Sequence, residues 1–258
     1  MKRNETISNY QIRNLLITTV IGVGILSLPS QMASIMNNDG WIPIAIGGLL
    51  LIPFVMMMDK IFKIYPDKNI YEIGVDIYGK FLHNIFMLVV FMYFVIQEAY
   101  VARIFAEVVK AYLLETTPTE VIILTILLVS CYLARCEVQV LGRFATMIYF
   151  VLIFLVVFLI IISIPDADIT NMLPAFYSDF KKLPSAVIAS IFSYAGYEVV
   201  FIAYPYSDDK KGIFRFILRG LFIVTAIYLL VFIITLSLFG IDQMKREIWP
   251  TIAIANEV

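Results

Sequence analysis

The sequence predicts an all-α protein that crosses a lipid bilayer several times. Of its 258 residues, 61% are hydrophobic and 15% are charged, whereas a globular domain is about 45–50% apolar and about 25% charged. Several apolar runs reach the length of roughly 18 residues that is needed to cross a hydrocarbon core. Runs such as residues 151–162 do not alternate apolar with polar residues, which favours membrane helices over barrel strands.

Seven hydrophobic spans are expected, and an eighth is expected to begin near Trp249 and Pro250. The seven spans cover residues 12–36, 41–64, 81–114, 120–134, 144–164, 183–206 and 214–239. Short segments with Pro, Asn, Asp and Lys separate them, as is typical of loops. The apolar run behind Met1, Lys2 and Arg3 starts late and is long, so it is interpreted as the first span and not as a cleavable signal peptide.

The loop charges predict the orientation of the chain in the membrane. Thirteen Lys and Arg residues fall in the N-terminal tail, at the start of span one and in the loops after spans two, four and six, but only four fall on the opposite side. Positively charged loops remain on the cytoplasmic side. The N-terminus is therefore predicted to be cytoplasmic.

Several functional classes are disfavoured by the composition and motifs. The net charge of −1 gives no indication of nucleic-acid binding. The sequence shows no phosphate loop, no zinc-protease motif and no nucleophile elbow, so no enzyme, cofactor or metal is expected. The two cysteines, Cys131 and Cys136, lie in or beside an apolar run and are expected to be buried thiols.

Two spans contain residues that interrupt helices. Span one is expected to break near residues 22–29, where Gly22, Gly24 and Pro29 occur, and span six near residues 193–198, around Gly196. Glycine in a membrane helix often serves close packing instead. Interruptions in the first and sixth spans, however, are what an inverted repeat of five plus five helices would give, and such matched breaks indicate a transporter-type binding site.

Ionisable residues inside the membrane are the next candidates, because burying charge in hydrocarbon is costly. Glu198 follows Gly196 within span six and has no basic residue within one helical turn. It is expected to accept a substrate ammonium or to carry a proton, the alternative being a hydrogen-bonded structural carboxyl. Span three carries Glu98, Arg103, Glu107 and Lys110, although this long helix could simply emerge into water there.

The residues around these breaks resemble the endospore germination permease family, the germinant receptor B subunits of the amino acid–polyamine–organocation superfamily. The similarity rests on Ile7-Ser8-Asn9-Tyr10-Gln11, the break at 21–29, Ser193–Glu198 and Trp249-Pro250-Thr251, and it extends over essentially the whole chain. It implies a fold of two inverted five-helix repeats. Residues 1–165 would form the first repeat, and residues 183–258 would begin a second, incomplete repeat, because the sequence covers only about seven spans.

The resemblance also implies a function and a site. The family senses small nutrients, often amino acids, in the inner membrane of dormant spores, together with A and C receptor subunits. Carried over by position, the substrate-binding residues would be Thr19, Gly22, Val23, Gly24 and Leu26 of span one, Tyr93 and Gln97 of span three, and Tyr194, Gly196 and Glu198 of span six.

Three functions therefore remain open at this stage. The first is a receptor subunit that binds a nutrient and triggers germination. The second is a secondary transporter for an amino acid or amine, coupled to protons or sodium ions. The third is a structural membrane subunit whose helix breaks serve packing. Fold alone does not separate the first two.

Overall fold

The protein is all-α, as predicted. A computed structural model describes residues 6–66 and 68–257. Within these residues the one β-type pairing is an isolated bridge between Ile7 and Ser207. The α-helices are α1 (Asn9–Val20), α2 (Gly24–Met36), α3 (Trp41–Ile64), α4 (Ile70–Tyr112), α5 (Thr119–Ala134), α6 (Val138–Ser163), α7 (Leu183–Ser193), α8 (Val199–Ala203), α9 (Ile213–Arg246) and α10 (Pro250–Glu257). Four 3-10 turns complete the described fold: η1 (Asn37–Gly40), η2 (Ile169–Met172), η3 (Phe180–Lys182) and η4 (Tyr204–Tyr206).

Four helical stretches within the described residues are long and apolar enough to cross a membrane. They are Gly24–Ile64, which comprises α2, η1 and α3, together with Ile70–Tyr112, Val138–Ser163 and Ile213–Arg246. The other expected spans are shorter helices: α5 has 16 residues, and the sixth span is divided into α7 and α8. Length and apolar composition thus identify an integral membrane protein.

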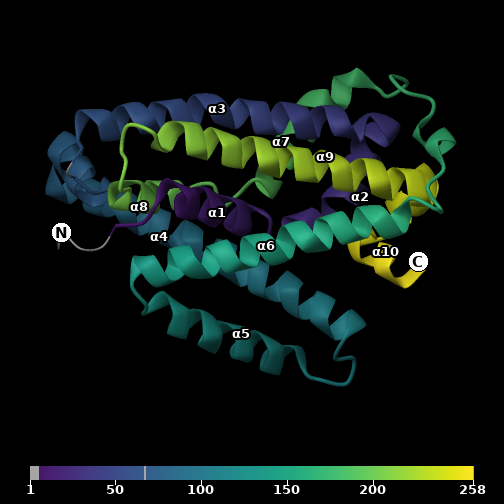
Figure 1. The fold of residues 1–258 in the computed structure, drawn as a ribbon, viewed down its shortest axis with the longest axis horizontal. Helices are drawn as coiled ribbons and strands as arrows, with labels where there is room; N and C mark the ends of the chain where they lie inside the picture. Colours follow the sequence, from purple (N-terminus) through teal and green to yellow (C-terminus); the bar gives the residue numbers. More distant parts are fainter. Residues whose placement is uncertain (1–5, 67, 258) are drawn as a thin grey trace.

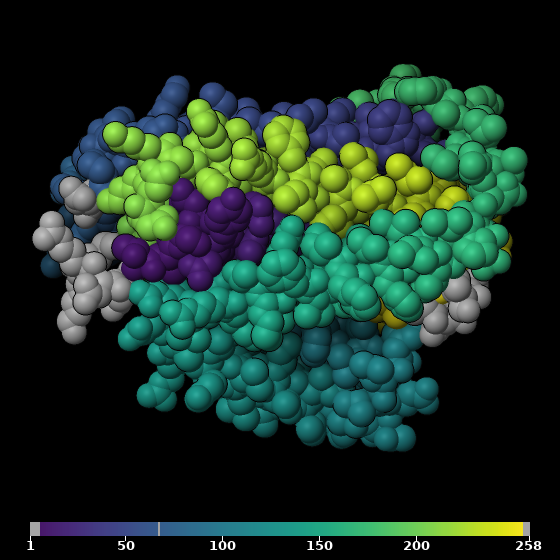
Figure 2. Space-filling view, viewed as in Figure 1, coloured from purple at the N-terminus to yellow at the C-terminus, as the bar shows by residue number. Residues whose placement is uncertain are grey.

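Helix α9 is the centre of the bundle. It packs against α1, α2 and α3, while α6 covers α1 and α7 covers α2 and α3 (Figure 1). Buried apolar side chains from these helices, among them Ile17, Leu28 and Val224, form one hydrophobic cluster. The hairpin of α4 and α5 lies along one side of this bundle, and α5 projects from it (Figures 1 and 2).

The start of α1 explains the sequence motif at residues 7–11. Ser8 and Gln11 form a capping box, in which the Ser8 hydroxyl accepts from the Gln11 amide at 3.3 Å and the Gln11 side chain accepts from the Ser8 amide at 2.9 Å. The Ile7 amide donates to the Tyr206 carbonyl at 2.9 Å, and the Ile7 side chain is buried. The motif therefore begins α1 and attaches it to the end of the sixth span.

Helix α4 begins earlier than the hydrophobicity of span three predicts. A capping box between Asn69 and Glu72 starts it at Ile70, eleven residues before Phe81. The first turns of α4 contain polar residues, so a search for apolar runs does not include them in the span. Gly79, at φ 75°, then bends the chain before the apolar stretch.

The break in span one is narrower than expected. The helix is interrupted only at residues 21–23 and resumes at Gly24, so Pro29 lies inside α2. A proline has no amide hydrogen for the carbonyl four residues earlier, which here belongs to Ile25. The Thr251 hydroxyl donates to that carbonyl at 2.8 Å, so α10 supplies the hydrogen bond that Pro29 cannot.

The turn at the end of α2 holds the long connection between α6 and α7. Asp39 is fully buried and accepts backbone hydrogen bonds from Phe176 at 2.6 Å and from Ser178 at 3.0 Å. The Ser178 hydroxyl in turn donates to the Met36 carbonyl. The connection is thus anchored next to the end of the first span.

The cysteines are not buried, contrary to expectation. Cys131 is exposed and Cys136 is partly exposed, and both are free. They lie on α5 and in the turn after it. Most of α5 is uncovered by the rest of the chain, so an apolar stretch there faces outward instead of into a core.

Candidate functional site

The first break, at residues 21–23, frees backbone groups in the middle of span one. Ile21 leaves helical geometry at ψ 72°, and the amide of Gly22 turns back to the Val20 carbonyl at 2.9 Å. Helix α2 then starts at Gly24 with no side chain capping its N-terminus. The uncapped amides at this end carry partial positive charge.

The second break, at residues 194–198, separates α7 from α8. Gly196 has φ 107°, a conformation that residues with a Cβ rarely adopt. Its amide donates to Glu198 Oε2 at 2.6 Å. The break thereby turns the Glu198 carboxylate back onto its own backbone.

The two breaks lie directly against each other. A Cβ atom on Gly196 would stand 3.0 Å from the Thr19 carbonyl oxygen, and one on Gly24 would lie 3.4 Å from the Ser193 backbone. The backbone of the first span therefore passes the backbone of the sixth without an intervening side chain.

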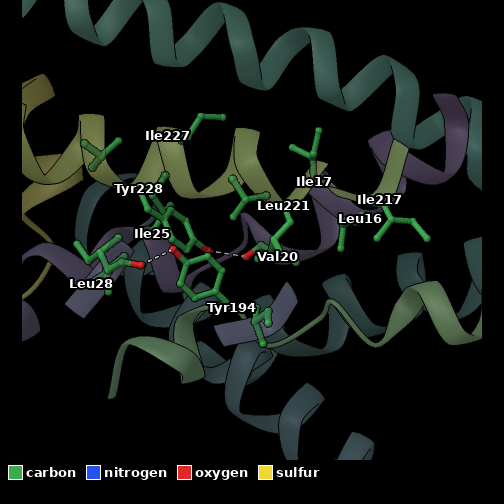
Figure 3. Packing of buried hydrophobic residues seen from close by; sticks show 14 of the residues in the cluster. Leu16, Ile17, Val20, Ile25, Leu28, Tyr194, Ile217, Leu221, Ile227 and Tyr228 are labelled. Carbon is green, nitrogen blue, oxygen red and sulfur yellow. Dashed lines mark hydrogen bonds between the residues drawn. The ribbon is translucent and has the colours of Figure 1, made fainter. Parts of the chain in front are cut away.

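Tyr228 of α9 connects the carbonyls that the breaks release. Its hydroxyl lies 2.9 Å from the Val20 carbonyl, at the end of α1 (Figure 3). It also lies 2.7 Å from the Ser193 carbonyl, at the end of α7. Both are acceptors, and the hydroxyl has a single hydrogen to donate. The one hydrogen is therefore shared between two helix ends, of which the Val20 end is buried and the Ser193 end is partly buried.

A cavity of about 980 Å³ opens beside the two breaks, between them and α4. Eight of the predicted site residues line it: Thr19, Gly22, Val23, Gly24, Tyr93, Gln97, Gly196 and Glu198. These residues come from α1, the first break, α2, α4 and the second break. The structure thus brings together side chains that are up to 179 positions apart in the sequence.

Two predicted site residues lie outside this cavity. Tyr194 is fully buried, and its hydroxyl donates to the Ile44 carbonyl at 2.9 Å, so it joins the second break to α3. Leu26 is partly buried and packs against the hydrophobic core. Both residues therefore contact the interior of the bundle and do not line the cavity.

Both carboxylate oxygens of Glu198 have donors. In addition to the Gly196 amide on Oε2, the Tyr93 hydroxyl donates to Oε1 at 3.1 Å from the α4 side of the cavity. Glu198 is partly exposed to the cavity. The carboxylate and the uncapped end of α2 therefore line the same cavity.

Further polar residues line the cavity that were not among the predicted site residues. Ser27 and Gln31 follow Gly24 on one face of α2, at a spacing that brings them onto a single stripe. On α4, Glu98 and Arg103 also line it, and Arg103 pairs with Glu107 at 2.6 Å. In the sequence, the i, i+3 spacing from Gly24 to Ser27 and the i, i+4 spacing from Ser27 to Gln31 could have indicated that these residues share the face of α2 that lines the cavity.

Among the described residues, no group of three or more His, Cys, Asp and Glu side chains is arranged to hold a metal ion. The chemistry that the cavity offers is instead that of hydrogen bonds, the carboxylates of Glu98 and Glu198, the guanidinium of Arg103 and a helix N-terminus. Within the part of the chain that the structure describes, four apolar stretches long enough to cross a membrane define an α-helical integral membrane protein, and two helix breaks lie beside one cavity in it.

The chain belongs to the spore germination protein family, the spore permeases, whose sequence profile matches residues 6–258. This family is described by its part in spore germination and is not a class of enzymes.

Several curated relatives share this similarity over most of the chain. Spore germination protein A2 of Bacillus subtilis is 28% identical over 249 residues, which are 96% of this chain and 68% of the relative. Spore germination protein B2 of the same organism is 23% identical and is matched over 99% of this chain and 69% of its own length. Spore germination protein GerQB of Bacillus cereus is 23% identical over 96% and 68%.

Proposed function

We propose that the protein is the membrane subunit of a nutrient germinant receptor, which binds a small nutrient such as an amino acid in the cavity at the two helix breaks. The observation that carries the proposal is the Glu198 carboxylate, which faces the same cavity as the uncapped N-terminus of α2. A carboxylate suits an ammonium group, and a helix N-terminus suits a carboxylate. An amino acid zwitterion carries both groups.

The family supports a role in germination over one in metabolism. In this proposal the chain works with A and C receptor subunits in the spore inner membrane, and its N-terminus is cytoplasmic. Its helices would belong to two inverted five-helix repeats, with α1 and α2 forming the first helix of one repeat and α7 and α8 the first helix of the other. Paired breaks at these two places support that assignment.

A secondary transporter for an amino acid or amine is the second candidate. It is favoured by the same broken helices and by an intramembrane carboxylate that could exchange a proton. The two functions differ in the step after binding. A receptor needs only that the nutrient bind one conformation better than another, whereas a transporter must release it on the opposite side.

The test measures germination of spores that carry the full-length protein, with Glu198 unchanged or replaced in Glu198→Gln, and uptake by membrane vesicles that contain the wild-type protein. A receptor predicts that the variant needs about tenfold to a hundredfold more nutrient for half-maximal germination, because a hydrogen bond to a charged group is lost. Vesicles that contain the wild-type protein should then accumulate no radiolabelled amino acid. Accumulation would favour the transporter, and an unchanged dose response at normal protein level would contradict both.

A further inference from the structure

Tyr93 occupies the side of Glu198 that faces across the cavity. Oε2 of this carboxylate is turned into the break by the Gly196 amide at 2.6 Å, so Oε1 is the oxygen presented to α4. The Tyr93 hydroxyl holds Oε1 at 3.1 Å. A ligand ammonium that approaches Glu198 from the cavity therefore finds the phenol of Tyr93 already bonded to Oε1.

Within the described residues, few side chains in the apolar stretch of the helix that carries Tyr93 are buried by the rest of the chain. In the most apolar stretch of α4 only 6% of the residues are buried, against 50% for α9. Helix α4 packs most extensively against α5, and Tyr93 itself is 43% exposed. The hydrogen bond from Tyr93 to Glu198 thus connects the α4–α5 hairpin to the second break.

We propose that the Tyr93 hydroxyl competes with the ammonium group of the nutrient for Oε1 of Glu198. When the ammonium replaces the hydroxyl there, the α4–α5 hairpin is released from the sixth span. This inference rests on the proposed function, because it takes Glu198 as the group that binds the ammonium. It adds a way in which nutrient binding at Glu198 changes the position of another part of the molecule.

The exchange is favourable in the direction that signalling requires. A phenol donates one hydrogen bond and carries no charge, whereas an ammonium offers three donors and a positive charge. The carboxylate makes the hydrogen bond from either donor charge-assisted, but only the ammonium adds the attraction between two opposite charges. The ammonium therefore displaces the phenol from Oε1, and the state without the Tyr93 bond is the one that binds the nutrient better, as a ligand-driven shift demands.

The proposal gives the effect of removing the phenol hydroxyl a definite sign. In Tyr93→Phe nothing competes for Oε1, so the half-maximal concentration of an equimolar mixture of the common L-amino acids should fall by about tenfold in spore germination. Tyr78→Phe is the matched control, because Tyr78 lies on the same helix outside the cavity and its hydroxyl has no hydrogen bond among the described residues. It should leave the dose response unchanged.

A double variant separates competition from a general loosening of the site. In a Glu198→Gln background the Tyr93→Phe change should lower the half-maximal concentration by much less than tenfold, because the two residues act on one interaction. An equally large fall in that background would overturn the proposal, as would a rise or no change in Tyr93→Phe at normal abundance. If Glu198→Gln alone has no effect, the proposed function fails first.

Movement of the hairpin has an independent readout in the native cysteines. Cys131 is exposed on α5, and Cys136, the other cysteine of the chain, can be replaced by serine. A spin label on Cys131 of the detergent-purified full-length protein should change its mobility when the amino acid mixture is added, and Tyr93→Phe should show the changed signal without it. A label that does not respond to the mixture in the wild type would contradict the release of the hairpin.

Discussion

Gly196 lies against the backbone of Thr19, so that the sixth span touches the first at the point where both are broken. A Cβ atom at position 196 would stand 3.0 Å from the Thr19 carbonyl oxygen, and the residue has φ 107°. Contact and conformation thus both require glycine at this position. The shape of the cavity depends on this contact, because both residues line it.

Gly196→Ala should therefore weaken both folding and nutrient response. The left-handed conformation costs an alanine about 1–2 kcal/mol, and the contact with Thr19 adds to this. We expect a lower thermal midpoint in detergent and a dose response shifted to higher nutrient concentration.

Gly22→Ala is the control for this substitution. Gly22 also lines the cavity, but the nearest atom to its added Cβ would be the Thr19 carbonyl oxygen at 3.8 Å. Its thermal midpoint should stay close to that of the wild type. Equal losses in the two variants would mean that the fit between the breaks is not what matters.

Thr251 should be required only because Pro29 is present. In Thr251→Val the Ile25 carbonyl loses its 2.8 Å hydrogen bond in a buried setting, which should destabilise the protein by about 1–3 kcal/mol. In Pro29→Ala the amide of residue 29 can reach that carbonyl within α2. The valine substitution should then cost clearly less in the Pro29→Ala background, as measured by the thermal midpoints of the four proteins. Strictly additive losses would contradict this explanation.

Tyr228→Phe should loosen both breaks at once. Its hydroxyl shares one hydrogen between the carbonyls of Val20, which is buried, and Ser193, which is partly buried, so the substitution removes the donor that lies within reach of both. We expect a loss of about 1–3 kcal/mol in unfolding free energy, together with faster hydrogen exchange of amides in α1 and α7.

Tyr206→Phe controls for the loss of a phenol, since no described hydrogen bond involves the Tyr206 hydroxyl. Unfolding and exchange should be close to wild type in that variant. If Tyr228→Phe also behaves like the wild type, the hydroxyl of Tyr228 has no role in holding the breaks.

The sequence was most informative where a local property decides the structure. The apolar length of residues 138–163 and 213–246 makes them membrane helices, and Gly196 permits the break in its span because glycine readily adopts a positive φ. The prediction that the break extends to Pro29 was wrong, because a proline leaves a helix intact where another group donates a hydrogen bond to the freed carbonyl. That group, on Thr251, is 226 positions from Ile25.

The site itself was only partly accessible to sequence reasoning. The cavity residues around both breaks follow from matched interruptions and from the family resemblance. The bonding of Tyr228 to Val20 and of Tyr93 to Glu198 does not, because tertiary packing brings these partners together across 208 and 105 positions. For the same reason, Tyr194 has the aromatic character of a binding residue but turns its hydroxyl to Ile44, behind the cavity.

The central claim is that the Glu198 carboxylate holds the ammonium group of an amino acid. The most direct measurement is thermal stabilisation of the detergent-purified full-length protein by an equimolar mixture of the common L-amino acids, because a ligand raises stability according to its concentration relative to its dissociation constant. The wild type should be stabilised in a concentration-dependent way, and Glu198→Gln should need about tenfold to a hundredfold more of the mixture for the same shift. Equal stabilisation of the two proteins would contradict the claim.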